Sequence, residues 1–255
     1  MANRTCVGCG RPLAKDVISR EHILPQWLEK EVHLPNVRFK QYRHDEDQPQ
    51  DELLRSYDLG SLAIKNVCRP CNNGWMSRLE NRAQPTLLAL MNMQSSLLEL
   101  STDERRAVSA WAIKTAFMIA SAQQSVAGLP WHLFRGLAEE PEKIPVECFV
   151  LATQLMSLPE GFLYACPTDI LGPQELPVHV RVGYSIHHLH FVVVIALLEA
   201  TRVVRTSGVH LPIWPLEAEI RVRFENFPRS MPPNDLINFL TGLVRAAIVH
   251  NRAVL

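Results

Sequence analysis

The stretch Cys68-Arg69-Pro70-Cys71 places two cysteines two residues apart, and the stretch Cys6-Val7-Gly8-Cys9 repeats this spacing. A pair of thiolates at this spacing can bind one metal ion from a tight turn, and two pairs complete the tetrahedral sulfur set that structural zinc prefers. A simple zinc ribbon separates its pairs by about 15–20 residues, and this chain separates them by far more. The sequence therefore predicts a structural Zn²⁺ site with a substantial insertion in its loop, formed by Cys6, Cys9, Cys68 and Cys71.

The overall composition is that of a globular protein with balanced charge. The 255 residues include 26 Lys and Arg and 26 Asp and Glu, and 47% are hydrophobic. This hydrophobic content is enough to bury a full core, which excludes intrinsic disorder as the main state. A net charge of zero excludes a polybasic coat for nucleic acid, although it does not bear on a local basic cleft.

Neither a membrane span nor a secretion signal is expected from the sequence. The longest apolar run, Phe191 to Leu198, is much shorter than the ~20 residues that cross a bilayer. The first residues, Met-Ala-Asn-Arg-Thr-Cys, lack the apolar region of a signal peptide. We therefore expect a cytoplasmic protein without a membrane partner, in which cysteines stay reduced and serve as metal ligands more often than as disulfides.

The insertion between the cysteine pairs carries Glu21-His22-Ile23-Leu24-Pro25, and the second pair runs directly into Asn72. An acid-His-x-x-Pro element between two Cys-x-x-Cys pairs, with Asn after the last Cys, resembles the HNH family of ββα-metal endonucleases in its zinc-stabilised form. The resemblance covers about residues 4–82. It implies a divalent-metal-dependent endonuclease that nicks or cuts DNA, with RNA not excluded as substrate.

The resemblance also implies roles for individual residues. Hydrolysis of a phosphodiester needs a base that activates water and a cation that holds the phosphate. By resemblance, His22 is the general base, and Glu21 and Asn72 bind one Mg²⁺ or Mn²⁺. Adjacent residues of an extended segment point in opposite directions, so Glu21 and His22 reach the same region only if the backbone turns locally.

The chain departs from the family pattern at two positions. Many members have Asp or His where this chain has Glu21, a longer carboxylate that still suits Mg²⁺. The middle Asn of the family name falls at position 63, which is Ala63, and Asn66 is the nearest candidate for its role. Asn73 is an alternative source of the metal contact, and Glu80 could add a carboxylate from the same helix.

A second interpretation remains beside the nuclease. Glu21 and His22 could form a buried polar pair within a zinc-binding module that does not catalyse anything. Such a module would scaffold a complex, or it would recognise nucleic acid or a protein partner.

The expected fold class is α+β, in two parts that meet near residue 100. Residues 1–100 are expected to form the zinc-bound, HNH-like ββα-metal module. Residues 101–255 are expected to select the target, bind a partner or mediate self-association, because they carry no second acid-base constellation.

The capping-box sequence Ser101-Thr102-Asp103-Glu104 predicts a long helix over 102–125. β-Branched runs predict an antiparallel sheet, and a Pro-Pro-Asn-Asp signal predicts a last helix. The predicted strands are 146–151, 161–166, 178–198 and 218–224, and the last helix is 233–249.

Three further features of the second part have more ordinary interpretations. His188 and His190 share a strand face but lack further ligands nearby, so a second metal site is not favoured. Lys114 lies in an apolar helical stretch, which favours a side chain whose ammonium reaches out to water. A set of arginines could contact phosphates across a sheet, but exposed strands carry Arg routinely: Arg202, Arg205, Arg221 and Arg223.

Overall fold

The computed structural model describes residues 4–31, 38–43, 52–58, 63–122, 129–140, 143–154, 163–171, 177–196 and 211–214. The predicted strand 218–224, the predicted helix 233–249 and the four arginines at 202, 205, 221 and 223 lie outside these residues. The described elements form a mixed α+β structure with antiparallel sheets, in agreement with the expected fold class.

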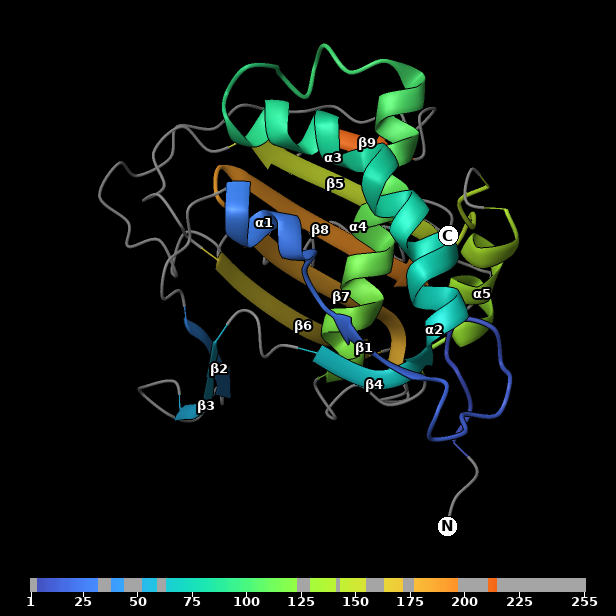
Figure 1. The fold of residues 1–255 in the computed structure, drawn as a ribbon. Helices are drawn as coiled ribbons and strands as arrows, with labels where there is room; N and C mark the ends of the chain where they lie inside the picture. The colour runs from blue at the N-terminus through green and yellow to red at the C-terminus, as the bar shows by residue number, and fades with distance from the viewer. Residues whose placement is uncertain are drawn as a thin grey trace, which may run out of the picture.

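The first part of the chain contains two antiparallel strand pairs (Figure 1). Strand β1 (Ile18–His22) pairs with β4 (Ala63–Cys68), and β2 (Arg38–Arg43) pairs with β3 (Glu52–Asp58). A short helix, α1 (Gln26–Glu31), follows β1. The β1–β4 pair therefore joins the two ends of the insertion in the zinc loop.

A helical segment continues directly from β4. It consists of α2 (Arg69–Cys71), the π-helical turn η2 (Asn72–Met76) and α3 (Ser77–Met91). Pro70 lies in the first turn of α2, where a missing N–H costs no helical hydrogen bond. Gly74 has non-helical dihedral angles, φ −97° and ψ −109°, and kinks the segment between α2 and α3. An antiparallel strand pair followed by a helix is thus the local architecture around the cysteines.

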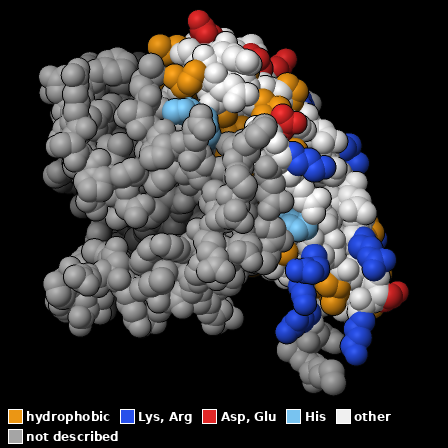
Figure 2. Space-filling model, turned by 60° about the vertical axis from the view of Figure 1, so that its left-hand side comes forward, with side chains coloured by type: hydrophobic (Ala, Val, Ile, Leu, Met, Phe, Trp, Pro, Cys, Tyr) orange, Lys and Arg blue, Asp and Glu red, His pale blue; other side chains and the backbone are white. Residues whose placement is uncertain are grey.

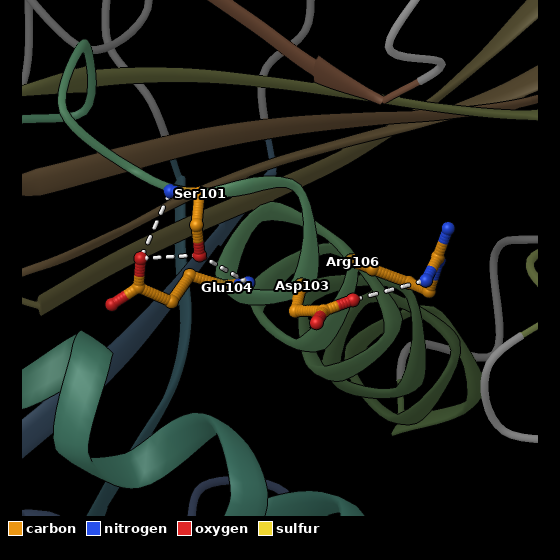
Figure 3. A network of polar contacts seen from close by, with 4 residues as sticks. All are labelled: Ser101, Asp103, Glu104 and Arg106. Carbon is orange, nitrogen blue, oxygen red and sulfur yellow. Dashed lines mark hydrogen bonds and ion pairs between the residues drawn. The ribbon is translucent and has the colours of Figure 1, made fainter.

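Helix α4 (Thr102–Ala122) occupies the centre of the molecule and is buried continuously from Ala107 to Ala120. Its first turn carries the predicted capping box, shown in Figure 3: the Ser101 N–H donates to Glu104 Oε2 at 2.9 Å, and the Glu104 N–H donates to Ser101 Oγ at 3.3 Å. Asp103 accepts a hydrogen bond from Arg106 at 3.2 Å on the same turn. The start of the predicted helix is confirmed, and its described end is Ala122.

The second part of the chain forms one large sheet after α5 (Trp131–Glu139). Its five described strands lie in the order β6-β7-β8-β5-β9, and each neighbouring pair is antiparallel. The apolar stretch expected as one strand over 178–198 is two strands, because His187 adopts a positive φ of 52° in the turn between them. The strands are β5 (Cys148–Gln154), β6 (Leu163–Leu171), β7 (Pro177–Ile186), β8 (Leu189–Ala196) and β9 (Leu211–Trp214).

Helix α4 connects the two parts by packing (Figure 1). It contacts α3 and β4, and it also contacts strands β5, β7, β8 and β9 of the large sheet. Trp111 of α4 packs edge-on against Tyr184 and Phe191, with ring centroids 6.3 and 5.9 Å away. One cluster of buried hydrophobic residues includes members from Cys6 to Ile213, so the described core continues across residue 100. Within the described residues, no helix combines the length and the apolar character that a membrane span requires.

Candidate metal centre and the charges beside it

The four predicted zinc ligands lie together. The Sγ atoms of Cys6, Cys9, Cys68 and Cys71 are all within 4.8 Å of one another, and Cys9 Sγ lies 3.8 Å from Cys68 Sγ. Zn–S bonds of about 2.3 Å in a tetrahedron place neighbouring sulfurs about 3.8 Å apart. The donor set and its spacing therefore fit a metal ion such as zinc, as the sequence predicts.

The first cysteine pair is held by a tight turn that depends on two glycines. The Gly10 N–H donates to the Cys6 carbonyl at 2.7 Å, and Gly10 has a φ of +74°, which L side chains rarely adopt. At Gly8 the turn passes so close to the second pair that an added Cβ would lie 3.1 Å from Cys71 Sγ. A side chain at Gly8 would therefore require Cys71 Sγ to move by a few tenths of an ångström.

The second pair is supplied by the β4–α2 junction, where Cys68 ends the strand and Cys71 ends the short helix. The Cys68 N–H donates to Cys6 Sγ at 3.2 Å, and the Val7 N–H donates to the Asn66 carbonyl at 3.0 Å. These two bonds fix the first turn to β4. A metal ion bound here would therefore fasten the N-terminal turn, β4 and the start of the helical segment to one another.

The electrostatic environment of the thiols differs within the centre. Burial raises the pKa of the Cys68 thiol and raises that of Cys71 further. Burial opposes ionisation of Cys6 too, but hydrogen bonds from Cys68 and from the backbone of its own turn outweigh it and lower the Cys6 pKa. The Cys6 thiol therefore ionises more readily than the thiols of Cys68 and Cys71, and a bound cation would favour the thiolate form of each ligand.

Glu21 is turned inward from β1. A register shift between Ser19 and Glu21 interrupts the β1–β4 ladder, and Glu21 is only 3% exposed. Its Oε1 atom lies 2.5 Å from the Nζ atom of Lys114 on α4, and the same Nζ lies 2.7 Å from Oε1 of Glu80 on α3. The structure therefore brings two of the predicted site residues, Glu21 and Glu80, to one ammonium group.

Lys114 is the functional candidate that the sequence interpretation missed. Its side chain is completely buried, so the expectation that its ammonium reaches water is wrong. Burial acts against its charge, but Glu80 and Glu21 outweigh burial and raise the pKa of Lys114. Burial also raises the pKa of Glu21, and Lys114 only partly offsets this. The available signal was a lysine within a wholly apolar helical stretch, because a fully buried lysine requires a carboxylate partner.

The other predicted residues take separate positions. The Asn72 amide nitrogen donates to the Ser19 hydroxyl at 2.6 Å, and Asn73 is exposed. Asn66 points toward α4, where its amide donates to Ser121 Oγ at 2.9 Å. His22 is half-buried at the end of β1, directly opposite Ala63. Glu21 is thus buried on Lys114, whereas His22, Asn66 and Asn72 are each half-buried.

The histidines of the β7–β8 turn take part in hydrogen bonding and ring packing. His190 Nδ1 lies 2.8 Å from Ser185 Oγ in a buried pair, and His187 Nδ1 lies 3.0 Å from the Met91 carbonyl. The rings of His187 and His188 pack edge-on, with centroids 4.3 Å apart. Within the described part of the chain, the four cysteines are the one cluster of three or more His, Cys, Asp or Glu residues whose ligand atoms lie together.

Exposed charge is unevenly distributed although the whole chain is neutral. In the segments 4–22 and 63–82, which flank the metal centre, the exposed charged side chains are basic with the exception of Asp16. Figure 2 shows Lys and Arg side chains gathered toward the lower right of that face, where acidic groups are few. A cation-rich surface of this kind attracts polyanions such as nucleic acid. The basic residues are Arg4, Arg11, Lys15, Arg20, Lys65, Arg69, Arg78 and Arg82.

Comparison with protein-family models, with curated proteins and with solved structures finds no match for this chain.

Proposed function

We propose that this protein is an endonuclease of the HNH type that hydrolyses DNA phosphodiester bonds. The observation that carries the proposal is the position of His22 on the β1–β4 pair, next to the four-cysteine cluster to which β4 contributes Cys68. His22 is solvent-accessible there, and the exposed charges of the surrounding segments are almost all basic. Basic side chains would hold the phosphates, and RNA would meet the same surface chemistry.

His22 supplies the base in this proposal. Its imidazole accepts a proton from water, the resulting hydroxide attacks phosphorus, the bond to the 3′ oxygen breaks, and this oxygen takes up a proton from solvent. The products are a 3′ hydroxyl and a 5′ phosphate. Family resemblance implies Mg²⁺ or Mn²⁺ on Glu21 and Asn72. The Glu21 carboxylate is paired with the Lys114 ammonium instead, so Glu21 does not fit this ion, whereas Asn72 uses its amide nitrogen, and not its oxygen, to bond Ser19.

The proposal is tested by incubating supercoiled plasmid with the purified, full-length protein in the presence of Mg²⁺ or Mn²⁺. Wild type should relax or linearise the plasmid, and His22→Ala should lose at least about 100-fold in rate because the base is removed. The control is His132→Ala, since His132 is an exposed histidine on α5. If His22→Ala cleaves as fast as His132→Ala does, His22 is not the base.

A second candidate function is supported by the state of Glu21. Because its carboxylate is buried on Lys114 and position 63 is Ala, the module could bind nucleic acid or a protein partner without cleaving it. Wild type that binds DNA but leaves it intact under both metals would favour this alternative.

Residues beyond 100 have a proposed role in either case. We expect them to select the target, to bind a partner or to mediate self-association, since the four-cysteine cluster and His22 lie before this boundary. This proposal is based on the size of the part formed by residues 101–255 and on the large sheet within it.

A further inference from the structure

We propose that Glu21 and Glu80 form a cation site whose resident cation is the ammonium of Lys114, so that in this chain Glu21 takes no divalent metal. Glu21 instead holds β1 against α3 and α4 through the ammonium that it shares with Glu80. This inference concerns metal binding and does not depend on whether the protein cleaves nucleic acid.

The geometry is that of an occupied site. One Nζ atom lies 2.5 Å from a carboxylate oxygen of Glu21 and 2.7 Å from one of Glu80. The side chains of Lys114 and Glu21 are 0% and 4% exposed, and that of Glu80 is 19% exposed. An ammonium offers three donors, and two of them are used by charged acceptors at short distance.

The competition between the ammonium and a divalent ion favours the ammonium. Lys114 is attached to the central helix, which is buried on every turn from Ala107 to Ala120, so its ammonium cannot diffuse away. A metal ion would have to displace a tethered cation and leave that cation buried without a partner.

The pairing also orients the neighbouring residue. The three charges come from β1, α3 and α4, and they hold Glu21 on the inner face of the strand. His22 follows in the chain and is half-buried at the outer end of the same strand. Lys114 therefore connects β1 to α4 through its ion pair with Glu21, and α4 belongs to the site although it lies beyond residue 100.

Calorimetric titration of Mn²⁺ into full-length, zinc-loaded protein tests this inference, with Glu21→Gln, Lys114→Met and the double variant beside wild type. We expect Glu21→Gln to bind the same number of Mn²⁺ ions as wild type with unchanged affinity. Lys114→Met should gain one Mn²⁺ per chain, because two carboxylates then lack their cation, and the double variant should lose that ion again. Lys114→Arg is the matched control and should gain none.

Two results would overturn the inference. Loss of a Mn²⁺ ion from Glu21→Gln alone would show that Glu21 binds metal with Lys114 present. A folded Lys114→Met that gains no Mn²⁺ would show that the ammonium does not occupy a cation site. The Glu21→Gln titration decides the question by itself if Lys114→Met does not fold, and none of these readings depends on cleavage activity.

Discussion

A lysine ammonium is stable in a protein interior only where carboxylates meet it, and Lys114 meets two. Removing one member of a buried ion pair leaves a charge without a partner, which costs about 3–5 kcal/mol. Lys114→Met leaves both Glu21 and Glu80 without their cation, whereas Glu21→Gln leaves Lys114 paired with Glu80. The two variants should therefore differ in stability although they disrupt the same ion pair.

We predict that Lys114→Met lowers the free energy of unfolding by about 3–5 kcal/mol and that Glu21→Gln lowers it by clearly less. In the double variant the loss should be smaller than the sum of the two single losses, because the residues share one network. Urea denaturation followed by circular dichroism measures all three. Equal losses for the two single variants would contradict a shared ammonium.

Gly8 gives a second prediction at the scale of a residue. A Cβ at Gly8 would lie 3.1 Å from Cys71 Sγ, whereas a Cβ at Gly136 on α5 meets no heavy atom within 4 Å. Gly8→Ala should weaken zinc binding, because Cys71 Sγ would have to move by a few tenths of an ångström to admit the methyl group. Gly136→Ala is the matched control and should leave zinc binding unchanged. Competition with a chromogenic chelator measures the affinity, and equal values for the two variants would contradict the close approach.

A site residue can be predicted from sequence when its role depends on neighbours along the chain, and not when it depends on how distant elements pack. The cysteine pairs were predictable, because a metal site prescribes both residue type and local spacing. The pairing of Glu21 with Lys114 was not, since it depends on how β1 and α4 pack and no local pattern records it. Asn72 shows the same limit, because its hydrogen bond to Ser19 is set by the fold.

At the scale of an element, the start of α4 rests on the capping box. Ser101 accepts from the Glu104 N–H, and its own N–H and hydroxyl donate to the Glu104 carboxylate at 2.9 and 2.7 Å (Figure 3). Ser101→Ala should lower the free energy of unfolding by about 1 kcal/mol. Thermal unfolding at neutral pH measures the loss, and an unchanged midpoint would show that the box adds nothing to stability.

The same cap predicts a pH dependence. Hydrogen bonds from Ser101 lower the pKa of Glu104 below its ordinary value of 4.5. A lowered folded-state pKa means that the contribution is present above the ordinary value and is lost as the pH falls through the lowered value. The difference in stability between wild type and Ser101→Ala should therefore shrink below about pH 4.5. A difference that stays constant in acid would exclude the ionised Glu104 as the acceptor.

Local signals predicted some elements well and others incompletely. The beginning of α4 was predictable because four consecutive residues contain all the groups that form its cap. The division of the 178–198 stretch was not, because the turn uses His187 at positive φ, where Gly or Asn would be the usual signal. The place of β9 beside β5, at the edge of the sheet, is a long-range choice that no local pattern encodes.

At the scale of the whole molecule, the basic side chains of segments 4–22 and 63–82 predict how the proposed DNA binding depends on charge and salt. Lys65→Glu and Arg69→Glu, each made as a single variant, should weaken binding and flatten the dependence of log affinity on log salt concentration by about 0.9 for each phosphate that the variant no longer neutralises. Fluorescence anisotropy at several salt concentrations measures both effects. Lys143→Glu is a control for charge, since Lys143 pairs with Glu140 away from these segments. Equal effects at all three positions would indicate a response to net charge alone.

The metal centre is central to the proposed function, because Cys68 ends β4, and β4 pairs with the strand that carries His22. Elemental analysis of purified, full-length protein by mass spectrometry tests this directly. We predict one zinc ion per chain in wild type, and loss of zinc together with unfolding of the β1–β4 region in Cys68→Ser. A well-folded wild-type protein that contains no zinc or other metal ion would contradict the account.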